Sequence, residues 1–101
     1  MNSNTNSTNY EKKILFALDY DGTYTADPEL WDIFIASAVK RGHSFIVATM
    51  RYPQEGLCII PPGIERVVYT GRKAKYEEVQ RQGFNPNIWI DDMPHFLFNG
   101  G

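Results

Sequence analysis

Long apolar runs alternate with amphipathic segments along most of the chain. Apolar residues fill 13–19 ("KILFALD") and 44–50 ("SFIVATM") almost without interruption, and shorter runs occupy 65–70 and 87–92. Runs of this length are typical of strands that are covered on both faces, as in a parallel sheet. The pattern therefore predicts four buried strands.

The segment between the first two strands has the pattern of a helix. Asp27 is a good N-cap, Pro28 suits the first helical turn, and Gly42 suits the position just after a helix. Apolar side chains recur at i, i+4 spacings, in the two series Leu30, Phe34, Ala38 and Trp31, Ile35, Val39. This segment should therefore form a helix with one wide apolar stripe.

Strands that alternate with helices predict one α/β domain, Rossmann-like and three-layered, with a small parallel sheet of about four strands. We expect the strand order 3-2-1-4, a second helix within 72–83 closed by Gly83, and a short helix after Met93. The connection 51–64 contains three prolines and two glycines, so it has space for a short helix around 54–60 or for an irregular link.

Length and composition set the broad class of protein. The 101 residues suffice for one domain, which we expect over 12–101, while the polar segment 1–11 is expected to be a disordered tail. The net charge of −2 argues against sequence-specific nucleic-acid binding. No apolar run approaches the length of a membrane span, and a soluble, cytoplasmic protein is expected.

The single cysteine, Cys58, excludes an internal disulfide and fits a reducing compartment. It has no neighbouring basic residue that would mark a reactive thiol. We therefore expect Cys58 to be a buried structural thiol.

Polar residues gather where the predicted strands end. Asp19 and Asp21 follow the first strand, Thr49 ends the second, and Asp91 and Asp92 end the fourth. The carboxyl ends of parallel strands meet at one edge of a sheet, where ligands bind. Carboxylates gathered there repel one another unless a cation neutralises them, and an all-oxygen cluster suits Mg²⁺ first. With the Thr49 hydroxyl and a lysine ammonium, this edge would accept a phosphoryl group.

Four motifs in this order resemble the haloacid dehalogenase superfamily of phosphohydrolases. They are "DYDGT" at 19–23, "VATM" with Thr49, "RKAKYEE" at 72–78, and "IWIDD" at 88–92. The resemblance covers about residues 13–95, and the four motifs together are far more specific than any one alone.

The resemblance implies a role for each matching residue. Asp19 would be the nucleophile that forms an aspartyl-phosphate, and Asp21 the general acid/base. Thr49 would bind a phosphoryl oxygen, and Lys73 or Lys75 would offset negative charge at the site. Lys75 is favoured because it shares a helix face with Val79.

The metal-binding set implied by the resemblance is Asp19, the main-chain carbonyl of Asp21, Asp92 as a ligand and Asp91 as its supporting partner. Candidate substrate-binding residues are four residues within the motifs and Arg51, which directly follows "VATM": Gly22, Thr23, Thr49, Lys75 and Arg51.

Short connections leave no place for the cap domain that many members of this superfamily carry. Only five residues, 22–26, separate Asp21 from the helix cap at Asp27. Only Gly71 and Arg72 separate Thr70, at the end of the third strand, from the helix expected next. Members without a cap tend to accept bulky phosphorylated substrates or to take a lid from another subunit, so a homo-oligomer is left open.

The sequence thus predicts a Mg²⁺-dependent phosphohydrolase acting on a phosphorylated small molecule or macromolecule end, with nucleotides and nucleic-acid ends among the candidates. The alternative is a catalytically weak or inactive protein of the same fold that sequesters a phosphorylated or nucleotide ligand. A phosphoacceptor receiver domain is disfavoured, because the third strand ends in "VVYT" without an aspartate.

Overall fold

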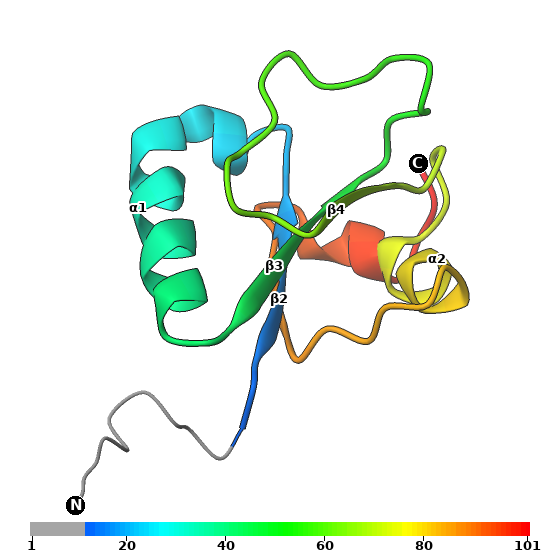
Figure 1. Ribbon diagram of the computed structural model, residues 1–101. Helices are drawn as coiled ribbons and strands as arrows, with labels where there is room; N and C mark the ends of the chain where they lie inside the picture. The colour runs from blue at the N-terminus through cyan, green and yellow to red at the C-terminus, as the bar shows by residue number, and fades with distance from the viewer. Residues whose placement is uncertain (1–11) are drawn as a thin grey trace, which may run out of the picture.

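A four-stranded parallel sheet forms the centre of the computed structural model, which describes residues 12–101. The expectation of a disordered tail over 1–11 lies outside the described residues. The strands are β2 (Leu15–Asp19), β3 (Ser44–Thr49), β4 (Arg66–Tyr69) and β5 (Ile88–Ile90). Their order is β4-β3-β2-β5, so the predicted order and the all-parallel sheet are confirmed (Figure 1).

The register of the two central pairings places the ends of the first and last strands side by side. β2 lies between β3 and β5, with Asp19 opposite Ala48 and Leu18 opposite Ile90. Both pairings are parallel, so the residues that follow β2 and β5 emerge at the same edge of the sheet.

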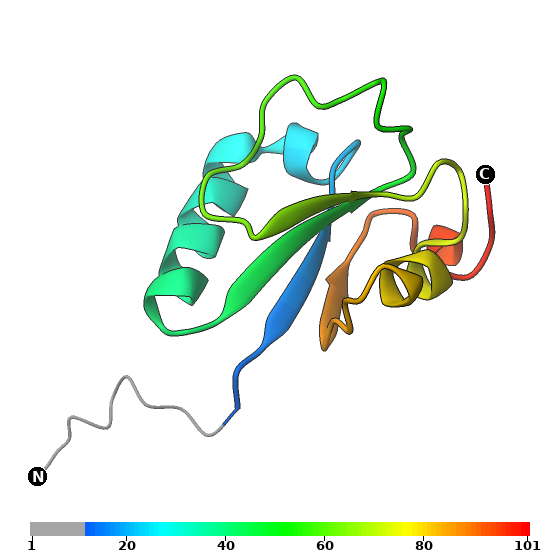
Figure 2. The same ribbon diagram turned by 45° about the vertical axis from the view of Figure 1, so that its right-hand side comes forward.

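The two helices cover opposite faces of the sheet, α1 (Pro28–Lys40) on one side and α2 (Lys75–Arg81) on the other (Figures 1 and 2). Alternate strand residues point to alternate faces, so the core has two halves. Phe16, Leu18, Phe45 and Val47 pack with Ile35 and Ala38 of α1, and Ala17, Ile46, Ala48 and Val68 pack with Val79 of α2.

Helix α1 begins and ends where its capping residues predict. The Asp27 carboxylate accepts a hydrogen bond from the Leu30 N–H, at 3.2 Å, and Gly42 adopts φ +94° after the last turn. The apolar stripe of α1 is wider than the part of the helix that packs against the sheet. Ile35 and Ala38 are buried, but Phe34 and Val39 remain about two-fifths exposed.

The connection from β3 to β4 is irregular, without the short helix that 54–60 had space to form. Leu57 and Ile64 pack against the core on the α1 side, whereas Cys58 is exposed. The expectation of a buried thiol is therefore wrong. In an irregular segment no helical period fixes which residues face the core, so Leu57 packs against the core while its neighbour Cys58 is exposed. The link runs over the edge of the sheet where the candidate residues gather (Figure 1).

Helix α2 begins later than the sequence pattern suggests. Arg72 adopts φ +70°, a left-handed conformation, and the Thr70 hydroxyl donates to the Lys73 carbonyl at 2.8 Å. These contacts hold 70–74 in a turn, so Lys75 is the first helical residue and Lys73 lies outside the helix.

The connections β2–α1 and β4–α2, where the sequence leaves no place for a cap domain, are short in the structure as well. Between β2 and α1 lies one turn of 3₁₀ helix, η1 (Tyr24–Ala26), and β5 is followed by a second, η2 (Pro94–Leu97). Within 12–101, neither the β2–α1 nor the β4–α2 connection contains an inserted domain. No helix in this part of the chain has the length and apolar character needed to cross a membrane.

Candidate functional site

Three carboxylates meet at the carboxyl edge of the sheet. Asp19 is the last residue of β2, and Asp91 and Asp92 directly follow β5. Each offers one oxygen, and these atoms all lie within 4.8 Å of one another. Asp19 is buried, Asp91 is half-buried and Asp92 is exposed, so the cluster extends from the core to solvent.

Lys75 is the cation of this cluster. Its Nζ donates to Asp19 Oδ1 at 2.5 Å and to Asp91 Oδ2 at 2.6 Å, and its side chain is only 4% exposed. The ammonium reaches this position because Lys75 opens α2 on the side that faces the sheet, one turn before the fully buried Val79. Lys73 instead lies 4.0 Å from Glu78 Oε1 and is 67% exposed.

The Thr23 hydroxyl joins the two loops that carry the acids. The hydroxyl is the donor toward two carboxylate oxygens, Asp19 Oδ2 at 2.9 Å and Asp92 Oδ1 at 3.0 Å. Its oxygen also accepts a hydrogen bond from the Asp92 N–H at 3.1 Å. Thr23 was a substrate-binding candidate in the sequence. In the structure its hydroxyl is hydrogen-bonded to both carboxylates, and its role toward a substrate stays a prediction.

Gly22 permits the close approach of these loops. It adopts φ +85°, and a Cβ at this position would lie 2.7 Å from Asp92 Oδ2. Its N–H donates to the Thr25 hydroxyl at 2.9 Å. Gly22 therefore makes space for Asp92, and its own N–H is used within the turn.

Asp21 stands apart from the other three acids. Its carboxylate forms a bidentate pair with Arg51, with Nε 2.9 Å from Oδ2 and Nη2 2.7 Å from Oδ1. The Arg51 hydrogen bonds lower the pKa of Asp21 below its ordinary value. The sequence predicted that Asp21 and Arg51 would both border the site but did not predict that they would pair.

Thr49 is 1% exposed at the end of β3, between the acids of the neighbouring strand and the start of the link. Its Oγ1 accepts a hydrogen bond from the Arg51 N–H at 3.3 Å. A hydroxyl that accepts in this way keeps its own proton to donate to a ligand.

A pocket of about 170 Å³ brings these residues together. Its lining consists of Asp19, Asp21, Thr49, Lys75, Asp91 and Asp92 with three apolar residues, Met50, Met93 and Phe96. Pockets for drug-sized ligands typically measure about 300–1,000 Å³, so this pocket has space only for a small group, such as a phosphoryl group with part of its leaving group. The sequence analysis missed the apolar residues; the adjacency of Met50 to Thr49 and of Met93 to Asp92 was the available signal.

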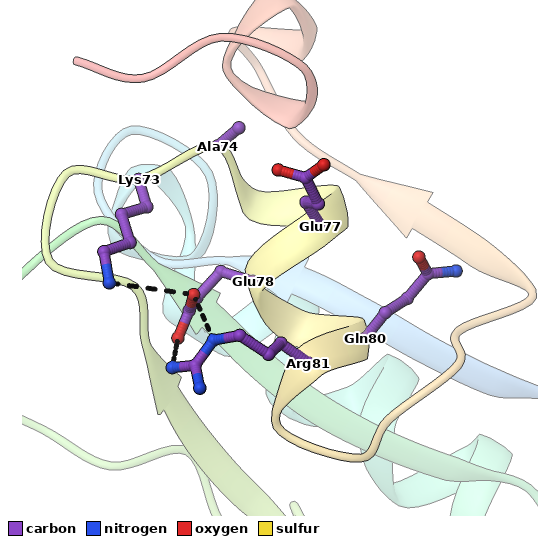
Figure 3. Close-up of a pocket in the computed structure, with 6 residues that line it drawn as sticks. All are labelled: Lys73, Ala74, Glu77, Glu78, Gln80 and Arg81. Atoms are coloured by element: carbon purple, nitrogen blue, oxygen red, sulfur yellow. Dashed lines mark hydrogen bonds and ion pairs between the residues drawn. The ribbon is translucent and has the colours of Figure 1, made fainter.

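A larger hollow, of about 460 Å³, lies against the outer side of α2. Figure 3 shows Glu78 directed at both Arg81 and Lys73, whereas Glu77 points away from these three side chains. Hydrogen bonds from Arg81 and Gln82 lower the pKa of Glu78 to about 2. These charges compensate one another, and the hollow contains none of the strand-end acids.

Electrostatics of the acidic cluster favour a cation. Burial raises the pKa of Asp19 to about 6 although Lys75 acts in the opposite direction, and the nearby Asp91 and Asp92 add to the increase. Three carboxylates face one ammonium. Their oxygen donors are of the kind that hard divalent ions prefer, and exposed Asp92 gives such an ion access from solvent.

Comparison with protein-family models, with curated proteins and with solved structures gave no match for this chain. The function must therefore be argued from the geometry and chemistry of the site.

Proposed function

We propose that this protein is a Mg²⁺-dependent phosphohydrolase that acts through an aspartyl-phosphate on Asp19, as the resemblance to the haloacid dehalogenase superfamily implies. The observation that supports the proposal most directly is the convergence of Asp19, Lys75 and Thr49 on one small pocket that Asp92 also borders. Four separate sequence motifs supply these residues, and the parallel pairing of β2 with both β3 and β5 brings three of them together.

The donor set fits a magnesium ion. Asp19, Asp92 and the main-chain carbonyl of Asp21 would hold it, and Asp91 would support the set through Lys75. When bound, the ion would neutralise negative charge on the phosphoryl oxygens and on the attacking carboxylate.

In the first half of the reaction, a carboxylate oxygen of Asp19 attacks phosphorus and the P–O bond to the leaving group breaks. The Asp21 carboxyl donates its proton to the departing oxygen, so an alcohol leaves and Asp19 carries the phosphoryl group. In the second half, the Asp21 carboxylate takes a proton from water while the water oxygen attacks phosphorus. The bond to Asp19 breaks, which releases inorganic phosphate and regenerates both carboxyl groups.

The other residues of the pocket stabilise charge and position groups. The Lys75 ammonium, 2.5 Å from Asp19 Oδ1, offsets charge at the nucleophile and at the phosphoryl group. The Thr49 hydroxyl is placed to donate to a phosphoryl oxygen. Thr23 fixes the carboxylate of Asp19 against that of Asp92.

A second candidate function is a binding protein that holds a phosphorylated ligand without turning it over. One observation favours it: both oxygens of Asp21 are engaged by Arg51, and Asp21 must leave this pair to serve the leaving group.

Hydrolysis of p-nitrophenyl phosphate by the purified chain, with and without Mg²⁺, tests the proposal. We expect turnover that is abolished by EDTA and by Asp19→Asn. The matched control is Asp27→Asn, which makes the same chemical change at a helix N-cap where asparagine also caps well. Turnover that survives in EDTA or in Asp19→Asn would contradict the mechanism. Tight phosphate binding without turnover would favour the binding protein.

A further inference from the structure

Arg51 is held in place by the link rather than by Asp21 alone. Its Nη1 donates to the Gly56 carbonyl at 2.8 Å, and its guanidinium lies 5.4 Å from the centre of the Tyr20 ring. The Tyr20 hydroxyl in turn donates to the Ile59 carbonyl at 2.9 Å and accepts from the Ile59 N–H at 3.1 Å. The guanidinium thus has contacts with the link and with Tyr20 that do not depend on Asp21.

The pair between Arg51 and Asp21 is of a kind that exchanges easily. The side chains are 26% and 54% exposed, and exposed ion pairs contribute little to stability because water solvates the separated charges well. Nε and Nη2 of Arg51 form a fork that fits two oxygens of any planar carboxylate, and two oxygens of a phosphate equally well.

Asp21 borders the pocket, so its partner Arg51 stands beside the place where a leaving group would lie. While Arg51 engages both of its oxygens, the Asp21 carboxylate is held in its ionised form and has no proton to give to a leaving oxygen. A substrate anion that takes over the Arg51 fork would release Asp21 to reach that oxygen.

We propose that Arg51 selects phosphomonoesters that carry a second anionic group close to the ester, by exchanging the Asp21 carboxylate for that group. This inference rests on the proposed function and deepens it, since it names the class of substrate. A neutral hydroxyl cannot replace the carboxylate in the fork, because it offers one oxygen and no charge. The small pocket requires the second anion to be near the ester, as in a short phosphorylated acid.

Two compounds that differ only at this group test the proposal. 3-Phosphoglycerate has a carboxylate where glycerol 3-phosphate has a hydroxymethyl group. We expect kcat/KM for 3-phosphoglycerate to exceed that for glycerol 3-phosphate by about tenfold or more in the unaltered protein, as for a gained bidentate ion pair. Arg51→Met should bring the ratio close to one, and Arg51→Lys should leave an intermediate ratio because it keeps the charge without the fork.

Arg72→Met is the matched control. Arg72 is the arginine that follows β4; it donates to the Met50 carbonyl at 2.9 Å and lies 3.4 Å from Glu55. Its loss removes the same charge beside the same pocket wall, and we expect the substrate ratio to be retained. A ratio near one in the unaltered protein, or a ratio lost in Arg72→Met but kept in Arg51→Met, would overturn the proposal.

Binding measurements keep this inference separable from the proposed function. Calorimetry on Asp19→Asn, with and without Arg51→Met, measures the affinity for both compounds in the absence of turnover. A preference for 3-phosphoglycerate that depends on Arg51 would support the inference even if no compound is hydrolysed, in which case only the enzymatic proposal fails. Equal affinities, with Mg²⁺-dependent hydrolysis of p-nitrophenyl phosphate intact, would overturn the inference alone.

Discussion

Asp19 and Asp21 lie two residues apart at the end of β2, but their surroundings shift their acidity in opposite directions. Asp19 is 7% exposed, and burial raises its pKa to about 6 against the influence of Lys75. The Asp21 side chain is 54% exposed, and Arg51 lowers its pKa. The backbone explains the difference: Asp19 completes β2 inside the sheet, whereas Asp21 follows the buried Tyr20 into the turn.

This comparison shows that residue type alone does not assign roles within the acidic cluster. These shifts run opposite to the usual assignment, in which the general acid has the raised pKa and the nucleophile stays ionised. Asp21 must therefore leave Arg51 before it can act as an acid, and a cation beside Asp19 would favour its ionised form. The deep region, Asp19 with Lys75 and Asp91, is shielded from solvent and joined by hydrogen bonds from one ammonium to two carboxylates. The rim, Asp21 with Arg51, is solvated and exchangeable.

The largest effect is expected from Lys75→Met, which removes the cation between Asp19 and Asp91. Breaking one partner of a buried ion pair leaves uncompensated charge and typically costs about 3–5 kcal/mol. Urea denaturation at pH 7 without divalent metal measures the change in unfolding free energy. Lys73→Met is the matched control, because Lys73 is 67% exposed and should change stability by less than about 0.5 kcal/mol. Equal effects of the two variants would show that the deep region is not a buried charge cluster.

A smaller effect is expected from the titration of Asp19, measured as the change in the free energy of unfolding with pH in the absence of metal. The folded-state pKa of Asp19, about 6, lies above the ordinary 3.8, so the folded state binds more protons between these values. Stability should therefore fall as pH rises from about 4 to about 6, by an amount on the order of 1–3 kcal/mol. Asp19→Asn should lack this loss, and adding Mg²⁺ should reverse it in the unaltered protein. A loss that persists in Asp19→Asn would assign it to another group.

Gly22→Ala tests the turn that joins the two regions. Alanine at φ +85° costs about 1–2 kcal/mol, and its Cβ would also press on Asp92 Oδ2. Gly42→Ala is a close control, since Gly42 has φ +94° but nothing within 4 Å of an added Cβ. Both variants should lose stability, but only Gly22→Ala should weaken Mg²⁺ binding, measured by calorimetry. Equal metal affinities would mean that Asp92 needs no such clearance.

The parallel sheet and its order were predictable, because unbroken apolar runs and short connections leave few alternatives. Helix α1 was equally predictable from Asp27, Pro28 and Gly42, since capping is a local property of the sequence. The choice of Lys75 over Lys73 depends on where α2 begins, and that depends on the left-handed Arg72.

The partner of Asp21 was not predictable in the same way. Arg51 is 30 residues away, and its guanidinium reaches Asp21 because of the path that the irregular link takes past Gly56 and Ile59. The exposure of Cys58 has the same origin. Proline and glycine disfavour a helix in this link, but they do not specify which irregular path the chain follows instead.

The smallest stability effect is expected at the rim, from a double-mutant cycle of Asp21→Asn and Arg51→Met. Because the pair is exposed, its coupling free energy should be about 0.2–1 kcal/mol. The lowered pKa of Asp21 means that this contribution is present above its ordinary pKa and is lost as pH falls below it. Urea denaturation of the four proteins at pH 7 and at pH 3 measures both quantities. A coupling of about 3–5 kcal/mol, as large as the effect expected for Lys75→Met, would mean that Arg51 holds Asp21 too firmly to exchange it, and would remove the distinction between rim and deep region.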